Sequence, residues 1–234
     1  MDSLVKRDTA LAQADILAFE RAAWERGCCR VAGVDEAGRG SLAGSVVAAA
    51  VVLNEDSCLL DLADSKLLPA STRQRLAEEL KQALPSGAWA VVAVEAAEVD
   101  RLNILRATHL AMRQALSALR PTPDFALVDG LPVPGLLTAS RAIVKGDRQS
   151  ASIAAASILA KVHRDHLMQL CDQQFPGYDF ATHKGYGTVG HLEALRRLGP
   201  CPLHRRSFAP VAQCLATTAH YQLELTLTDN LNDS

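Results

Sequence analysis

Two adjacent acidic residues, Asp35 and Glu36, end an apolar segment and are followed at once by the glycine-flanked arginine of residues 38–40. Carboxylates attract cations, whereas an arginine and bare backbone N–H groups bind phosphate. The glycines permit positive φ angles and let a ligand approach the backbone closely. A loop that offers both kinds of group predicts metal-assisted phosphodiester chemistry, although a tight turn with a structural ion pair would use the same residues.

Two further acids stand at the ends of short apolar segments. Asp129 ends the predicted strand 125–129, and Asp147 follows the predicted strand 136–145. Because neighbouring strand ends converge at one edge of an α/β sheet, these acids can approach Asp35 and Glu36 in space. Each acid taken alone could equally well be structural. Their joint placement at strand ends favours a shared site.

A cluster of four carboxylates repels itself unless cations neutralise it. Hard oxygen donors of this kind select Mg²⁺ or Mn²⁺ over zinc or copper. Two such ions about 4 Å apart can activate a water and stabilise the leaving oxygen in phosphodiester hydrolysis. The small residues of 150–157 would let the next helix sit close to the sheet and hold Asp147 rigidly, but a close-packed helix without any site would also have this composition.

The remaining pattern predicts the elements that position these acids. Apolar, valine-rich runs predict strands, and apolar residues near helical spacing predict helices. Strands are expected at 31–36, 46–53, 89–95, 125–129 and 136–145, and helices within 1–29 and at 71–84, 97–119 and 150–170, with Ser71 as an N-cap. Strands interleaved with helices indicate an α/β fold with a mixed central β-sheet flanked by helices.

We divide the chain into four parts on this basis. They are an N-terminal helical segment (1–29), a catalytic core (30–170), a C-terminal helical substrate-binding extension (171–225) and a flexible tail (226–234). The core is feasible because 49% of the 234 residues are hydrophobic. No apolar run has the length of a membrane span and no signal core follows Met1, so we expect a cytoplasmic protein without membrane contact.

Charge is distributed unevenly along the chain. Residues 141–206 carry ten Lys/Arg and five Asp/Glu, a balance of +5, against −7 elsewhere and −2 overall. This asymmetry fits a basic surface for nucleic acid, and it also fits a solvated helix face. None of the six cysteines forms a Cys-x-x-Cys pair that would indicate a zinc or redox site. We see no assembly motif and expect a monomer.

The ordered motifs together resemble bacterial ribonuclease HII, the type 2 ribonuclease H family, from about residue 31 to 211. The matching segments are GVDEAGRG (33–40), DSK (64–66), NIL (103–105), VDG (128–130), KGD (145–147), 150–162 with RD (164–165), HKGYG (183–187) and HRRSF (204–208). The loop departs from the usual family pattern because Ser41 and Ser45 stand where prolines are common. Losing two prolines would loosen this loop.

The resemblance implies a ribonuclease H-like fold with a C-terminal helical extension. It also implies Mn²⁺- or Mg²⁺-dependent endonucleolytic cleavage, with two divalent ions in the active complex. The substrates would be the RNA strand of RNA–DNA hybrids and duplex DNA with single embedded ribonucleotides, cut on the 5′ side to leave 3′-hydroxyl and 5′-phosphate ends. Such an enzyme removes misincorporated ribonucleotides and RNA primers.

Site residues follow from the same resemblance. Asp35, Glu36, Asp129 and Asp147 are expected to be the catalytic and metal-binding acids. The substrate-binding residues are expected to be Gly38, Arg39 and Gly40 at the 2′-hydroxyl and phosphate, Tyr186 stacked on the next sugar, and Lys66, Arg205 and Arg206 at phosphates.

Structural or surface roles without any substrate contact remain open for several of these residues. Lys66 fits a solvated surface charge equally well, and Arg205 and Arg206 fit capping or surface roles. For Asp165 we favour an ion-pair or supporting role over metal ligation, and His183 and His191 are expected to be structural or surface residues.

Two other classes of function stay open as well. One is another carboxylate nuclease or integrase-like enzyme of the same fold, against which the Gly-Arg-Gly loop and Tyr186 argue together. The other is a catalytically silent nucleic-acid-binding module, against which the four intact acids argue.

Overall fold

The computed structural model describes residues 15–53 and 69–217. Its centre is a five-stranded sheet in the order β3-β2-β1-β4-β5. The strands are β1 (Val31–Ala37), β2 (Val46–Leu53), β3 (Trp89–Val94), β4 (Phe125–Asp129) and β5 (Ala139–Ile143). β1 pairs antiparallel with β2, and β2 with β3, whereas β1, β4 and β5 are parallel to one another. The expected mixed sheet is therefore confirmed.

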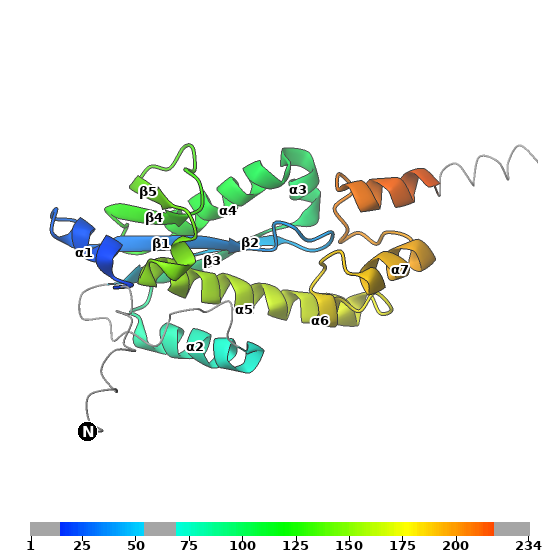
Figure 1. The fold of residues 1–234 in the computed structure, drawn as a ribbon, viewed down its shortest axis with the longest axis horizontal. Coiled ribbons are helices and arrows are strands. Elements are labelled where there is room, and N and C mark those ends of the chain that lie inside the picture. Colours follow the sequence, from blue (N-terminus) through cyan, green and yellow to red (C-terminus); the bar gives the residue numbers. More distant parts are fainter. Residues whose placement is uncertain (1–14, 54–68, 218–234) are drawn as a thin grey trace, which may run out of the picture.

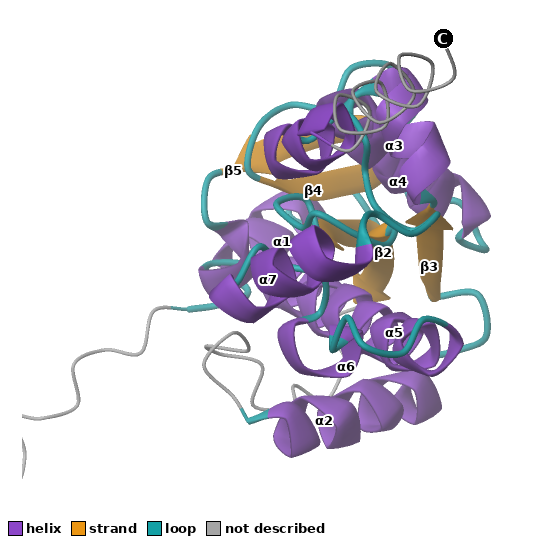
Figure 2. Cartoon of the chain, turned by 90° about the vertical axis from the view of Figure 1, so that its right-hand side faces the viewer, coloured by secondary structure: helices purple, strands orange, loops and turns teal. Residues whose placement is uncertain are grey.

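Helices cover both faces of this sheet (Figures 1 and 2). They are α1 (Ala18–Trp24), α2 (Ala70–Ala83), α3 (Ala96–Leu102), α4 (Ile104–Ala118), α5 (Ala151–Gln174), α6 (Phe180–His183) and α7 (Val189–Leu198). A short 3₁₀ turn, η1 (Gly146–Arg148), precedes α5, and residues 209–217 are also helical. The helical region after α5 agrees with the expected C-terminal extension.

Each face of the sheet has its own apolar core because side chains alternate along a strand. One core packs α5 and α2 against Val47, Ala49 and Val51 of β2, and the other packs α4 against the intervening residues Ala48 and Ala50. These strand residues are all fully buried. Burial on both faces explains why the sequence of β2 is continuously apolar.

The first turns of α5 pack closely against the backbone of β1. A Cβ atom at Gly33 would fall 2.0 Å from the carbonyl carbon of Ser152. Small residues on both elements permit this approach, as predicted from the composition of residues 150–157. Buried Glu20 of α1 fixes the start of α5, because its Oε1 accepts hydrogen bonds from Ser150 Oγ (2.5 Å) and from Ser152 N (2.9 Å) and Oγ (2.6 Å).

Several element boundaries differ from the prediction. The helix expected at 97–119 is two helices, because Asn103 adopts φ 67° and its side chain accepts a hydrogen bond from Arg106 N, capping α4. The strand expected at 136–145 is only the five residues of β5. Pro69, not Ser71, occupies the N-cap of α2. None of the described helices is long and apolar enough to cross a membrane.

Candidate active site

Asp35 lies in β1, two residues before its last residue, and Asp129 ends the neighbouring parallel strand β4. The register pairs Val34 of β1 with Val128 of β4. Asp35 and Asp129 are the next residues of these two strands, so they lie side by side at the same edge of the sheet. Asp129 Oδ1 accepts a hydrogen bond from Gly146 N at 2.6 Å and a longer one from Asp147 N at 3.4 Å. The backbone of η1 thus ties Asp147 to the tip of β4, and residues distant in sequence meet at one edge as expected.

Burial distinguishes these acids from ordinary surface carboxylates. Asp35 and Asp147 are 1% and 5% exposed, although charged residues are seldom buried without compensating interactions. Asp35 Oδ1 accepts from Glu36 N at 2.7 Å. The Glu36 side chain, 13% exposed, forms an ion pair with Arg39, whose Nη1 lies 3.1 Å from its Oε1.

The donor chemistry of these side chains fits a hard divalent cation, since all are carboxylate oxygens. Their separation is less compact than a ligand cluster: among the described residues, no three His, Cys, Asp or Glu side chains come close enough to hold one metal ion. The structure brings the backbone of Asp147 to the side chain of Asp129, and the β1–β4 register places Asp35 next to Asp129. Shared ligation by all four acids stays a prediction.

A pocket of about 330 Å³ opens next to Glu36. Residues 36–40 form one wall, and Arg73 of α2, Ser157, Ile158 and Lys161 of α5, and Tyr186 line the rest. The family resemblance predicts Gly38, Arg39, Gly40 and Tyr186 as substrate-binding residues, and the structure places these four around one pocket. Arg73 and Lys161 were not predicted, although a lysine one helical turn after Ser157 on the small-residue face of α5 was a usable signal.

Two buried arginines hold the β1–β2 connection, residues 38–45. Arg164 of α5 donates from Nε to Ser45 O (3.1 Å) and from Nη2 to Ala43 O (3.2 Å). Arg205 donates from Nε to Gly44 O (3.0 Å) and from Nη1 to Arg39 O (2.9 Å). Two guanidinium groups thereby fix four backbone carbonyls of one loop, so the loop is held firmly with serines, and no prolines, at positions 41 and 45.

The position of Arg205 corrects one prediction. Its side chain is fully buried, so it supports the loop from below and does not present its guanidinium to a phosphate. Burial, together with the nearby Arg164 guanidinium, lowers the pKa of Arg205 to about 10, and burial also lowers the pKa of Arg164. Arg205 therefore remains charged at neutral pH. Arg206 is exposed, with its backbone N donating to Asp100 Oδ2 at 2.8 Å.

Gly38 is required at its position for two reasons. Its φ is +91°, and a Cβ atom there would lie 1.9 Å from Arg164 Nε. Any larger residue would strain the backbone and displace the arginine that supports the loop. The glycine of the motif therefore has a packing role in addition to any contact with substrate.

Tyr186 packs against the same loop. Residues 41 and 186 form an antiparallel β-bridge, and Leu42 N donates to Gly185 O at 2.8 Å. Tyr186 is 39% exposed, and the Arg164 guanidinium lies 5.5 Å and Lys161 Nζ 6.0 Å from its ring centroid. A flat ring that lines a pocket close to two cations of α5 suits stacking on a sugar or base.

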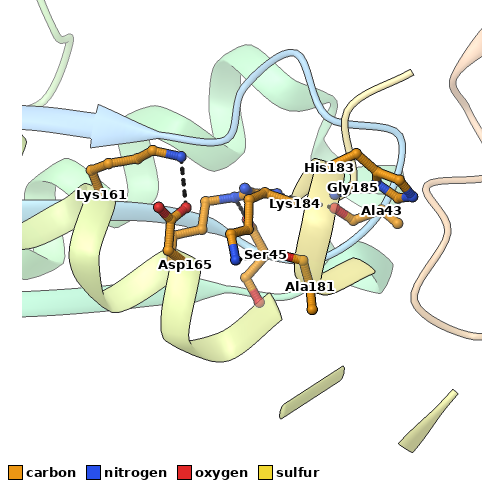
Figure 3. Close-up of polar contacts among 9 residues, drawn as sticks. Ala43, Ser45, Lys161, Asp165, Ala181, His183, Lys184 and Gly185 are labelled. Carbon is orange, nitrogen blue, oxygen red and sulfur yellow. Dashed lines mark hydrogen bonds and ion pairs between the residues drawn. The ribbon is translucent and has the colours of Figure 1, made fainter. Parts of the chain in front are cut away.

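Figure 3 shows the neighbouring polar contacts on α5 and on the segment after it. Lys161 Nζ and Asp165 Oδ1 form an ion pair at 2.6 Å, which is the role we favoured for Asp165. Ala43 and Gly185 also pack closely, because a Cβ atom added at Gly185 would lie 2.6 Å from Ala43 O. Lys66 lies outside the described residues, so its predicted phosphate contact is carried forward only as a prediction.

Comparisons with known proteins agree with this geometry. The sequence model of the family described as ribonuclease HII matches residues 32–211. Curated proteins named ribonuclease HII from Moorella thermoacetica and Albidiferax ferrireducens are 54% and 55% identical to this chain over 193 and 185 residues. These alignments cover 82% and 79% of this chain and 93% and 88% of the relatives.

Solved structures show the same fold. The ribonuclease H2 from Pyrococcus horikoshii OT3 superposes with a TM-score of 0.66 at 28% identity, covering 79% of this chain and 96% of that one. A Bst ribonuclease HIII in complex with Mn²⁺ gives a TM-score of 0.64 at 19% identity, covering 84% of this chain and 72% of the other. At that identity the likeness concerns the fold alone.

Proposed function

This chain belongs to the ribonuclease HII family, and we propose that it cuts duplex DNA on the 5′ side of a single embedded ribonucleotide and hydrolyses the RNA strand of RNA–DNA hybrids. The products would carry 3′-hydroxyl and 5′-phosphate ends. The observation that carries this proposal is the shared pocket: the 38–40 backbone, Arg39 and Tyr186 line one cavity beside Glu36, at the sheet edge where the other acids lie.

The acids would hold the divalent ions on which this family depends. Asp35, Glu36, Asp129 and Asp147 are the side chains proposed to bind two Mg²⁺ or Mn²⁺ ions, which supply Lewis-acid stabilisation of the phosphate and lower the pKa of a bound water. Asp129 is already oriented, because two backbone N–H groups of η1 donate to its Oδ1. The remaining residues position the substrate.

Substrate recognition is proposed to divide between charge and shape. Arg39 and Lys161 border the pocket and would attract the scissile phosphate. Arg206, which is exposed, and Lys66, which lies outside the described residues, are proposed contacts to flanking phosphates. The narrow backbone of Gly38 and Gly40 would approach the 2′-hydroxyl, the group that distinguishes RNA from DNA at one position. Tyr186 would stack on the neighbouring deoxyribose, where an added hydroxyl would crowd the ring.

The physiological role we infer is removal of misincorporated ribonucleotides and RNA primers in the cytoplasm, by a monomer. The substrate class itself supports this role, since an enzyme that cuts beside one ribonucleotide acts on DNA that contains replication errors or primer remnants. The net charge of +5 over residues 141–206 supports a nucleic-acid surface on this part of the chain.

A cleavage assay with three matched duplexes tests the proposed function. One duplex contains a single ribonucleotide, one a full RNA strand paired with DNA, and one only DNA, each incubated with Mg²⁺, with Mn²⁺ or with EDTA. We expect divalent-ion-dependent cutting of the first two, with the single cut mapped to the 5′ side of the ribonucleotide. Equal cutting of the all-DNA duplex would indicate a general nuclease, and binding without cutting a silent binding module.

A further inference from the structure

Two buried histidines connect Tyr186 to the C-terminal region. His191 of α7 is 0% exposed and His204 is 2% exposed. His191 Nδ1 lies 2.9 Å from Tyr186 O, the two Nε2 atoms are 3.1 Å apart, and Cys201 N donates to His204 Nδ1 at 3.0 Å. The contacts form an unbroken chain from Cys201 to the Tyr186 carbonyl.

The direction of every bond in this chain is fixed by chemistry. A carbonyl oxygen only accepts, so His191 Nδ1 must carry a hydrogen and, in a neutral ring, His191 Nε2 must accept. His204 Nε2 must then be the donor, which leaves His204 Nδ1 as the acceptor that the Cys201 N–H requires. The two rings are therefore opposite tautomers, with hydrogen on Nδ1 of His191 and on Nε2 of His204.

A second proton on either ring would set two N–H groups against each other. The surroundings oppose such protonation: burial and the neighbouring His191 ring lower the pKa of His204 to about 4, and burial lowers the pKa of His191. His183 stacks on His191 with the centroids 4.3 Å apart, and its own nitrogens contact Tyr178 O (2.7 Å) and Gly185 N (3.1 Å). Both rings of the chain are thus neutral at pH 7.

The two histidines are connected both to Tyr186 and to the 38–45 loop. Tyr186 O accepts from Thr188 N at 2.8 Å as well as from His191, so both of its lone pairs are used. Residues 43 and 204 form a β-bridge, which places His204 against the same loop that pairs with Tyr186. The histidines therefore contact both Tyr186 and the 38–45 loop, the two parts of the surface proposed to bind the ribonucleotide.

We propose that His191 and His204 are positioning residues that fix Tyr186 against the 38–45 loop, and that they set selectivity for a single embedded ribonucleotide. This inference rests on the proposed function, because Tyr186 is the residue proposed to stack beyond the ribonucleotide. It extends that function by two buried residues that touch neither substrate nor metal. A displaced Tyr186 ring would lower the cleavage rate on the single-ribonucleotide duplex, because displacements of about 1 Å can lower an enzyme's rate on the order of 10²-fold.

Two substitutions at His191 separate its hydrogen bond to Tyr186 O from its hydrogen bond to His204. In His191→Asn the amide nitrogen takes the place of Nδ1, so the bond to Tyr186 O is kept and the bond to His204 is lost. In His191→Gln the amide reaches the place of Nε2, so the bond to His204 is kept and the bond to Tyr186 O is lost. The two variants are similar in polarity, which makes each a control for the other.

We expect His191→Gln to lower the cleavage rate on the single-ribonucleotide duplex about 10-fold, the value of one hydrogen bond, and His191→Asn to lower it less than about 3-fold. Both variants should cut the full RNA–DNA hybrid within about 3-fold of the parent, because that substrate offers many ribonucleotides. Equal losses by Asn and Gln on the single-ribonucleotide duplex, or equal losses on both substrates, would overturn the positioning role.

A spectroscopic measurement tests this hydrogen-bond chain independently of any substrate. Two-dimensional ¹⁵N–¹H NMR of the imidazole rings at pH 7 should show hydrogen on Nδ1 of His191 and on Nε2 of His204. The same tautomer on both rings, or a protonated ring, would contradict this hydrogen-bond chain. If instead these tautomers are found but the parent does not cut the single-ribonucleotide duplex, the proposed function fails and the selectivity role fails with it.

Discussion

Asp129 is the acid whose surroundings are defined most completely. Its Oδ1 accepts from two backbone N–H groups, and it stands at the tip of β4 beside the end of β1. The sequence marked Asp129 as a candidate because it ends a short apolar strand and belongs to a set of acids placed at strand ends. It could not show that η1 would supply the hydrogen bonds, since these come from residues 17 and 18 positions further along.

We expect Asp129→Asn to lower cleavage at least ~10²-fold, because it removes a ligand charge while keeping size and fold. Initial rates at saturating Mg²⁺ measure this effect, with circular dichroism to confirm the fold. Glu193→Gln on the exposed side of α7 is the matched control and should retain the parent rate. Parent-like activity of Asp129→Asn would remove this acid from the site.

Arg205 illustrates where reading single residues fails. In sequence it stands beside Arg206, and the pair suggests a phosphate contact. In the structure only Arg206 is exposed, while Arg205 is buried beneath residues 38–45. Neighbouring residues in a loop can point in opposite directions, and the tertiary contact that selects the direction for Arg205, with the carbonyls of Arg39 and Gly44, is more than 160 positions away.

Among the elements, α5 carries most of the site. It packs on β1 and β2, follows Asp147, provides Lys161 to the pocket and supports the loop through Arg164. Its position and small-residue face were predictable from composition, and so was β2, because residues 46–53 form an apolar run between a glycine-rich stretch and a polar stretch of the sequence. The break at Asn103 was not, because the apolar spacing continues through it and only the backbone angle reveals it.

The close contact of α5 with β1 gives a prediction for stability. Gly33→Ala would place a methyl group 2.0 Å from backbone carbon of Ser152, so the helix must shift. We expect a loss of about 2–3 kcal/mol in the free energy of unfolding, measured by urea titration. Gly190→Ala in α7 has open space around the added Cβ atom and should not destabilise the protein. Equal stabilities for the two variants would refute the close packing.

At the scale of the whole molecule, the fold joins an α/β core to a C-terminal helical region through one surface. Backbone hydrogen bonds join the loop 38–45 of the core to residues 183–187 and 203–205 of the C-terminal region. The sequence indicated both parts but not their junction, because the contacts are between segments separated by more than 140 positions.

The free energy of unfolding should depend on pH because His204 is buried where the core meets the C-terminal region. The pKa of folded His204 is lowered to about 4, against about 6.5 in an unfolded chain, so the unfolded state binds more protons between these values. The stabilisation is therefore present above pH 6.5 and is lost as pH falls toward 4, by on the order of 3 kcal/mol. Urea titrations from pH 7 to 4.5 should show a smaller decline in His204→Gln. Parallel declines in both proteins would contradict a neutral, buried His204.

The central claim is that Tyr186 and the 38–45 loop form one surface that recognises a single ribonucleotide and presents its phosphate to the acids. Single-turnover cleavage of a duplex with one ribonucleotide by Tyr186→Ala, measured beside its affinity for the same duplex, tests this claim most directly. We expect the rate to fall at least ~10-fold with affinity changed less than about 3-fold, because affinity rests mainly on phosphates. Tyr186→Phe should stay near the parent, since the ring is retained. Cleavage by Tyr186→Ala at the parent rate would contradict the account.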